Sequence, residues 1–195
     1  MQRCAWCSDD PLYIHYHDHE WGVPSRDPQV LFEFLLLEAF QAGLSWITVL
    51  RKRERYRQVL FGFDPQRLAQ LSDAEIDQLM LDPAIIRNRR KLEAVRNNAR
   101  AWLQLEDPAA FIWSFVDGRP RINHFTAREQ VPAVTAEAEA MSRALKKAGF
   151  SFVGPTICYA YMQACGLVMD HTTDCHRHAP LAAAAAADAA LIQVH

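Results

Sequence analysis

The chain has 195 residues, of which 50% are apolar, enough to fill the core of one domain or of two small lobes that share a core. Its 21 Lys and Arg against 23 Asp and Glu give a net charge of -2, which excludes a generally polyanion-binding surface, so any nucleic-acid contact must be local. No apolar run reaches the roughly 20 residues of a membrane-spanning helix, and the N-terminus lacks a signal-peptide pattern. We expect a globular protein of the cytoplasm with no membrane partner.

The number of cysteines indicates whether the thiols are reduced, bound to a metal or joined in disulfides. Five cysteines are an odd number in a chain of this length, which favours reduced thiols or metal ligands over a disulfide framework. They stand at Cys4, Cys7, Cys158, Cys165 and Cys175.

Helix-start signals recur along the chain, whereas almost nothing alternates with the period of a strand. An Asp–Pro pair combines a good N-cap with a proline at the first helical position. Such pairs occur at Asp27–Pro28, Asp64–Pro65, Asp82–Pro83 and Asp107–Pro108. Ser72 and Glu75 have the spacing of a capping box. We therefore predict an all-α protein of short helices.

Two apolar stripes at helical spacing predict core-facing helix surfaces. They comprise Leu92, Val95, Ala99, Trp102 and Leu103 in one segment, and Ala138, Met141 and Leu145 in another. Asp117–Gly118 predicts a turn. Residues 179–195 are alanine-rich and predict a terminal helix or a frayed tail. Residues 1–178 would then form a single domain, with a division into two helical lobes left open.

One carboxylate lies among apolar residues in the segment from Pro28 to Gly43. The face it shares comprises Leu31, Phe34, Leu35, Glu38 and Ala42. Burying an unpaired carboxylate costs many kcal/mol, so Glu38 needs a partner, a proton or a cavity that a ligand fills. A core glutamate bonded to an arginine or a backbone amide is the alternative, and position alone does not separate the two.

The two ends of the chain carry metal-ligand side chains. Residues 12–24 contain three histidines near Cys4 and Cys7, and residues 170–178 contain His171 and Cys175, one helical turn apart. Together they allow a tetrahedral zinc site with two ligands from each end. Surface histidines and free thiols are the alternative.

Residues 142–166 have the pattern of two helices joined by a glycine-containing turn. The first helix ends at Gly149 and the second begins at Pro155 and ends at Gly166. This is a helix-hairpin-helix pattern, in which backbone N–H groups bind a phosphate. A helical hairpin without that role is the alternative. Two basic runs, residues 51–57 and 87–100, are candidates for further phosphate contacts or are simply solvated faces.

The chain resembles the 3-methyladenine DNA glycosylase I family, constitutive alkylation-repair enzymes of bacteria in the helix-hairpin-helix superfamily. The similarity runs from Cys4 to about Cys175 and rests on DPLYI, EWG, QAGLSWITVLRKRE, IIRNRRK, NNARA, WSFV and LKKAGFSFVGPTICYAYMQACGLV. It implies a helix-hairpin-helix fold and a monofunctional enzyme that hydrolyses the N-glycosidic bond of 3-methyladenine in double-stranded alkylated DNA. The product is an abasic site, and we expect a monomer.

The resemblance also implies roles for particular residues. One structural Zn²⁺ would be held by Cys4, His17, His171 and Cys175, joining the N- and C-terminal segments. Cys7 departs from the family's usual residue and is a competing ligand. Four protein ligands leave no open position for water, which favours a structural metal.

The base pocket implied by the resemblance consists of Glu38 as the catalytic residue, Tyr16 and Trp46 as stacking walls, and Tyr13 at the rim. Glu38 would hydrogen-bond the adenine edge and favour the cationic base. Trp6 and Trp21 are interpreted first as packing residues. Asp170 lies roughly where related enzymes carry an aspartate, and a structural role is favoured for it.

DNA contacts are expected at two places. Gly43 and Leu44 would fill the gap left by the flipped base, unless Gly43 is only a helix cap. The hairpin residues Gly149, Val153 and Gly154 would contact the backbone.

Two other functions remain open: a DNA-binding module without excision, and a zinc hydrolase.

Overall fold

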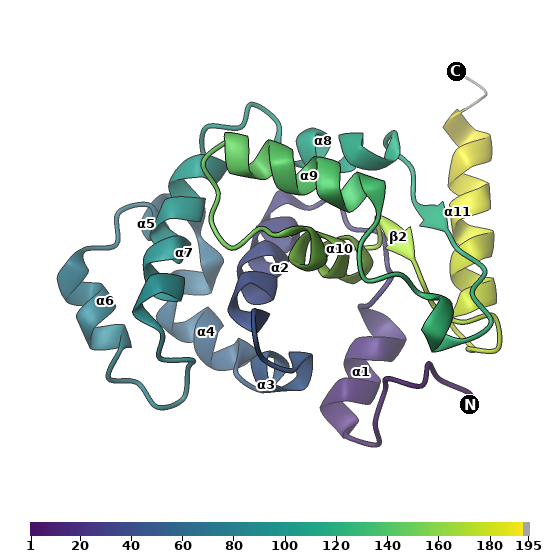
Figure 1. Ribbon diagram of the computed structural model, residues 1–195, viewed down its shortest axis with the longest axis horizontal. Coiled ribbons are helices and arrows are strands. Elements are labelled where there is room, and N and C mark those ends of the chain that lie inside the picture. The colour runs from purple at the N-terminus through teal and green to yellow at the C-terminus, as the bar shows by residue number, and fades with distance from the viewer. Residues whose placement is uncertain (193–195) are drawn as a thin grey trace.

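The computed structural model describes the backbone of residues 1–192 and the side chains of residues 1–187. Helices dominate this part of the chain, as predicted (Figure 1). The α-helices are α1 (Pro11–His19), α2 (Pro28–Gln41), α3 (Trp46–Leu50), α4 (Arg53–Val59), α5 (Pro65–Leu68), α6 (Asp73–Leu79), α7 (Arg89–Trp102), α8 (Pro108–Trp113), α9 (Ala136–Lys147), α10 (Pro155–Ala164) and α11 (His178–Ile192). The 3₁₀ turns are η1 (Phe61–Phe63), η2 (Ser114–Val116) and η3 (Arg128–Gln130).

Helix starts follow the predicted caps in three of the four Asp–Pro pairs. The carboxylates of Asp27, Asp64 and Asp107 accept hydrogen bonds from the first backbone N–H groups of α2, α5 and α8. Ser72 and Glu75 form the complete capping box at the start of α6. These signals are local in sequence, which is why they are readable without the fold.

The prediction of a helix after Asp82–Pro83 is wrong. The Asp82 carboxylate accepts from the Ala84 N–H at 2.8 Å, which closes a turn, and it also accepts from Arg55 Nε at 2.7 Å. Beyond the turn, the Ile85 side chain is buried and the Ile86 N–H donates to the Tyr56 hydroxyl at 3.0 Å. Tertiary contacts therefore keep this segment out of a helix.

Helix α2 is the centre of the fold, with α7 and α10 packed against it (Figure 1). Its side chains are buried almost all round, from Leu31 to Phe40, rather than on one face only. Ala42, expected on the buried face, is half-buried because the helix has ended there. Gly43 follows with a φ of +79°, a conformation that favours glycine.

The two apolar stripes face the core, with one exception. Leu92, Val95, Ala99 and Trp102 on α7 are buried, as are all three predicted residues of α9. Leu103 is 39% exposed because α7 ends at Trp102 and Leu103 caps it. The Asp117–Gly118 turn is confirmed, with both residues at positive φ.

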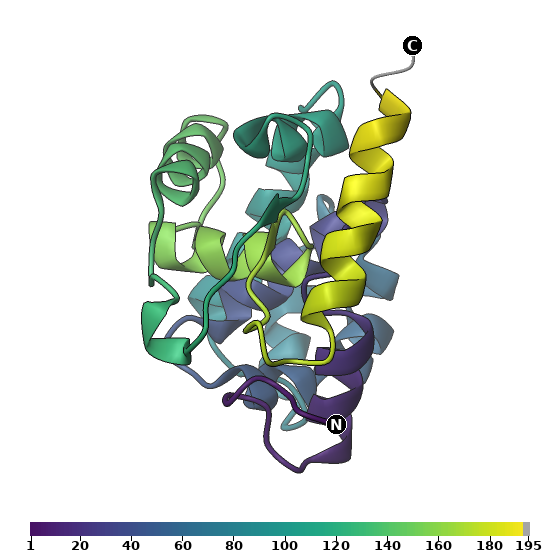
Figure 2. The same cartoon turned by 90° about the vertical axis from the view of Figure 1, so that its right-hand side faces the viewer.

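The N-terminal segment and the chain that follows residue 169 lie side by side. Strands β1 (Arg121–Ile122) and β2 (Val168–Met169) form a parallel pair with Arg121 opposite Val168. The chain after β2 then passes the N-terminus, where the His176 N–H donates to the Gln2 carbonyl at 3.0 Å (Figure 2). The predicted tail forms α11 as far as Ile192, and residues 193–195 lie outside the described part. None of the described helices is long and apolar enough to cross a membrane.

Candidate active site and metal cluster

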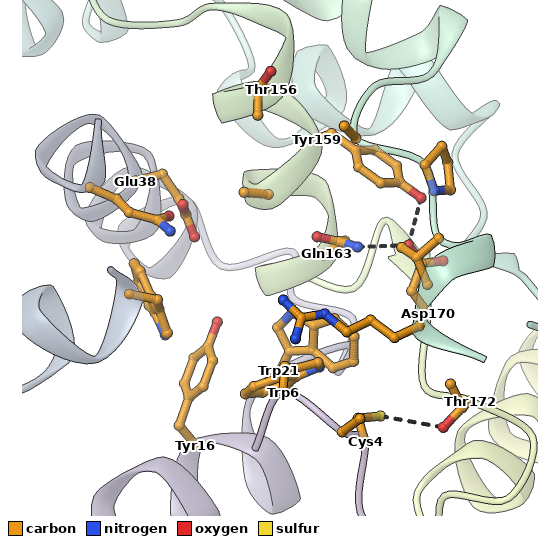
Figure 3. Close-up of a pocket in the computed structure, with 18 of the residues that line it drawn as sticks. Cys4, Trp6, Tyr16, Trp21, Glu38, Thr156, Tyr159, Gln163, Asp170 and Thr172 are labelled. Atoms are coloured by element: carbon orange, nitrogen blue, oxygen red, sulfur yellow. Dashed lines mark hydrogen bonds between the residues drawn. The ribbon is translucent and has the colours of Figure 1, made fainter. Parts of the chain in front are cut away.

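A cavity of about 370 Å³ lies where the N-terminal segment, α1, α2, α3, α10 and the chain after β2 come together (Figure 3). Its lining contains every residue expected in the base pocket: Tyr13, Tyr16, Glu38 and Trp46. These residues come from three different helices, so the fold rather than the local sequence brings them together.

Glu38 is buried in the cavity wall without a compensating partner. Its side chain is 2% exposed, and Oε2 has no hydrogen-bond partner among the described residues. Burial raises the pKa of Glu38 to about 8, so the free carboxyl is mostly protonated at neutral pH. The alternative of a core glutamate paired with an arginine is therefore not supported.

Arg53, a buried arginine, is bound to other acids. It donates to Glu20 and to Glu33, each at 2.5 Å. The two acids satisfy the guanidinium, and Glu38 takes no part in this network.

Aromatic rings form the rest of the wall. The rings of Tyr16 and Trp46 are 5.3 Å apart, and burial raises the pKa of Tyr16 well above its usual value, so its phenol stays protonated. Trp6 lies 5.0 Å from Tyr13 and 4.9 Å from Trp21. Trp6 and Trp21, interpreted from sequence as packing residues, also line the cavity. The buried indole N–H groups of Trp6 and Trp46 lack acceptors among the described residues. A ligand in the cavity could therefore accept hydrogen bonds from these two groups and also bond to Glu38 Oε2.

Asp170 lines the opposite side of the cavity from Glu38 (Figure 3). Its Oδ1 accepts from Asn123 Nδ2 at 2.6 Å, and its Oδ2 accepts from the Tyr159 hydroxyl at 2.5 Å and from Gln163 Nε2 at 2.8 Å. Sequence reasoning missed Tyr159 and Gln163. Their signal was the spacing of one helical turn on α10, which places both on the same face.

The four expected metal ligands form one buried cluster. The ligand atoms of Cys4, His17, His171 and Cys175 all lie within 4.8 Å of one another. His171 Nδ1 is 3.4 Å from each sulfur, and His17 Nε2 is 3.5 Å from the Cys175 sulfur. A sulfur and a nitrogen bound to the same tetrahedral zinc are separated by about 3.5 Å, so the donor set fits this ion.

Outer contacts orient both imidazoles. His17 Nδ1 lies 2.7 Å from an oxygen of Asp18, and Arg3 donates three hydrogen bonds to the same carboxylate. His171 Nε2 lies 3.0 Å from the Trp21 carbonyl oxygen. These contacts direct the remaining ring nitrogen of each histidine to the cluster, as in metal sites.

Cys7, the competing ligand, is not part of the cluster. Its side chain is half-buried, and its sulfur faces the Ser8 carbonyl at 3.6 Å. The surplus histidines likewise lie outside the set: His15, His19, His176 and His178.

The hairpin between α9 and α10 is held from behind. Gly149 adopts a φ of +94°, and Asn98 exchanges two hydrogen bonds with the backbone of Ser151, at 2.8 and 3.0 Å. Within the described part of the chain, the N–H groups of Phe152, Val153 and Gly154 have no acceptor. The Val153 side chain is buried, whereas a Cβ on Gly154 would meet nothing within 4 Å.

The first basic run is largely neutralised within the chain. Arg51, Arg53, Arg55 and Arg57 all pair with acids. This argues against residues 51–57 as a free phosphate-binding surface. In the second run, Arg87 and Arg90 have no ion pair among the described residues.

The loop after α2 lies beside the cavity. Gln41, at the last position of the helix, is one of the lining residues. Gly43 and Leu44 follow it and are exposed, with Leu44 at 41%.

The fold and the site define a class of helical protein with a cavity lined by aromatic rings and an unpaired buried acid. The chain belongs to the methyladenine glycosylase family, whose family model matches residues 6–178. This confirms the family expected from sequence.

This chain is similar in sequence and structure to known relatives over about nine-tenths of its length. It is 51% identical over 179 residues to DNA-3-methyladenine glycosylase 1 of Escherichia coli K12, covering 90% of this chain and 96% of the relative. A crystal structure of 3-methyladenine DNA glycosylase I has a TM-score of 0.90 at 53% identity, with 91% of this chain and 100% of that one covered. The Staphylococcus aureus enzyme, solved to show 3-methyladenine recognition, has a TM-score of 0.88 at 38% identity, covering 91% and 97%.

Proposed function

We propose that this protein is a monofunctional DNA glycosylase that extrudes 3-methyladenine from double-stranded alkylated DNA and hydrolyses its N-glycosidic bond, leaving an abasic site. The observation that carries the proposal is the unpaired, buried carboxyl of Glu38 in an aromatic cavity. Such a group is costly without a ligand, and a positively charged planar base is the ligand that offsets the cost.

The chemistry of the lesion suits this site. A base stacked in a duplex is out of reach, and extruding it costs a few kcal/mol, which stacking and edge hydrogen bonds offset. Methylation at N3 makes the base a cation while it is attached to the sugar, and this charge weakens the glycosidic bond. Less chemical assistance is then required than for a normal base.

Glu38 supplies selectivity for the charged base. A cation beside the carboxyl favours its ionised form, so base binding lowers the raised pKa of Glu38 and releases a proton. Neutral adenine offers no such compensation. Tyr16 and Trp46 stack on the base, with cation–π attraction contributing roughly 1–2 kcal/mol, and Tyr13 lies at the rim.

Hydrolysis needs a water molecule and no covalent intermediate with the protein. None of the described residues that line the cavity is a lysine, so no amine is placed to form an imine with the sugar. Asp170 already accepts three hydrogen bonds, which favours a structural and electrostatic role over one as a general base.

Two segments are proposed to contact the DNA. Gly43 and Leu44 fill the gap that the extruded base leaves in the stack. The helix-hairpin-helix residues Gly149, Val153 and Gly154 bind the backbone, and the support for this is the run of unbonded N–H groups before α10.

A structural Zn²⁺ is proposed at Cys4, His17, His171 and Cys175. When bound, the ion ties the N-terminal segment to the chain after β2, and the four protein ligands leave no position for a reacting water. We further propose that residues 1–178 act as a single domain and a monomer, with α11 as an appended helix.

The two rival functions make different demands. A DNA-binding module that has lost excision needs no intact pocket, yet Glu38, Tyr16 and Trp46 line the same cavity. A zinc hydrolase needs an open coordination position, whereas the cluster supplies four ligands.

The test is incubation of the purified protein with DNA treated with a methylating agent, followed by identification of the released bases. The proposal predicts free 3-methyladenine and abasic sites that break only after alkali. The absence of any released methylated base would contradict it. Base release with strand cleavage before alkali would contradict the monofunctional mechanism.

A further inference from the structure

One arginine lines the cavity although the proposed ligand is a cation. Arg128 lines the same cavity as Glu38 and Asp170. Of the described residues that line this cavity, Arg128 is the only Lys or Arg. A guanidinium next to a positively charged base would oppose its binding. The residue therefore calls for a different, anionic partner.

Arg128 has no such partner within the described part of the protein. No carboxylate forms an ion pair with it, no hydrogen bond from its side chain is present, and no aromatic ring lies under its guanidinium. Its side chain is exposed, whereas Glu38 is buried. The charge therefore lies at the rim of the cavity.

The segment that carries Arg128 is held in place. Gln130 Oε1 accepts from the N–H groups of Thr126 at 2.7 Å and Ala127 at 3.3 Å. The Thr173 N–H donates to the Phe125 carbonyl at 2.9 Å, which joins this segment to the chain after β2. Val131 directly follows η3 and is also part of the cavity wall. The position of Arg128 is thus part of the fold rather than a free loop end.

We propose that Arg128 binds a phosphate of the extruded nucleotide, an inference that rests on the proposed function. A base that enters the cavity brings its own sugar and flanking phosphates to the rim, and the phosphates are the only anionic groups of the substrate. The guanidinium of an arginine matches two phosphate oxygens at once. Arg128 is then a positioning residue that holds the extruded state without touching the base.

The test compares three variants with the wild type. Arg128→Gln removes the charge, Arg128→Lys keeps it, and Arg119→Ala removes an exposed arginine that is not among the lining residues. Two quantities are measured: the affinity at several salt concentrations for duplex DNA with one uncleavable abasic-site analogue, which keeps the phosphates but has no base to excise, and the affinity for free 3-methyladenine from the fluorescence of the cavity tryptophans.

Arg128→Gln is expected to weaken DNA binding about tenfold at low salt and to reduce the slope of log K against log salt by about 1, the signature of one lost phosphate contact. Arg128→Lys keeps the slope, Arg119→Ala keeps both affinity and slope, and all variants bind free 3-methyladenine as the wild type does. An unchanged slope in Arg128→Gln would overturn the inference, as would weaker binding of the free base. Failure of the wild type to release the base would instead refute the proposed function, since the salt slope is measured without excision.

Discussion

The ammonium of Lys91 lies 2.8 Å from the carbonyl oxygen of Phe40, near the end of the helix that carries Glu38. A second bond, 2.7 Å long, joins it to the Ala42 carbonyl. Lys91 is buried and has no acidic partner in the described chain, and burial lowers its pKa. It therefore closes α2 and fixes the point from which the Gly43–Leu44 loop leaves.

Replacing Lys91 by methionine should destabilise the protein by roughly 1–3 kcal/mol, because two carbonyl groups lose a charged donor. Chemical denaturation measures the change, and Lys147→Met, at an exposed position of α9, is the control. Equal stability of the two variants would show that the Lys91 contacts contribute nothing.

The burial of Glu38 makes a prediction about pH. The folded pKa of about 8 lies above the ordinary value of 4.5, so between these values the folded state binds more protons than the unfolded state. Stability from this group is fully present below about pH 4.5 and is lost as the pH rises to about 8. Removing the acid should therefore help most at high pH.

The variant Glu38→Gln should gain stability relative to the wild type as the pH rises from 5 to 8. The upper bound is on the order of 5 kcal/mol, since each pH unit between 4.5 and about 8 contributes about 1.4 kcal/mol. Urea unfolding of both proteins at each pH gives the difference, in which the titration of other groups cancels. A difference that does not vary with pH would mean that Glu38 has an ordinary pKa.

The outer contact of the metal cluster makes a separate prediction. Asp18→Asn weakens the acceptor that orients His17, so zinc affinity should fall about 10- to 100-fold while the fold is retained with excess metal. Competition with a chromophoric chelator measures the affinity. Asp9→Asn removes the same charge from an exposed position nearby and should leave it unchanged. Equal affinities in the two variants would exclude the Asp18–His17 contact as a determinant.

Cys4 and Cys7 offer a direct comparison of a buried thiol in the cluster with one outside it. Cys7→Ser should retain one zinc per chain, and cobalt substitution should give the spectrum of a four-coordinate site with two thiolates. Cys4→Ser should lose the metal or bind it weakly, with a lower melting temperature. Retention of zinc in Cys4→Ser together with its loss in Cys7→Ser would reverse the ligand assignment.

Much of the fold was predictable because its signals are local. The Asp–Pro caps and the Ser72–Glu75 capping box lie within four residues of the groups they bind, and three of the four Asp–Pro pairs open helices. The helix predicted after Asp82–Pro83 is absent because contacts from Tyr56 and Arg55, distant in sequence, decide the local conformation. The predicted burial of Leu103 was wrong because a periodic pattern does not show where a helix ends.

The site was predictable only in part. Helical periodicity places Glu38 toward the core, but it does not reveal whether the carboxyl is paired with another side chain or lines a cavity. The network of Tyr159 and Gln163 with Asp170 depends on β2 lying beside α10. Arg128 carries no sequence signal, because its significance lies in a cavity formed by segments far from it in the chain.

The central claim is that Glu38 recognises the cationic base, and single-turnover excision of 3-methyladenine from methylated duplex DNA tests it most directly. Glu38→Gln keeps the size of the side chain but cannot ionise, whereas Glu54→Gln alters an acid on the exposed side of α4 and is the control. The account predicts a folded Glu38→Gln protein whose excision is slower by about 100-fold, with weaker binding of the base, and a control that matches the wild type. Excision by Glu38→Gln at the wild-type rate would contradict it.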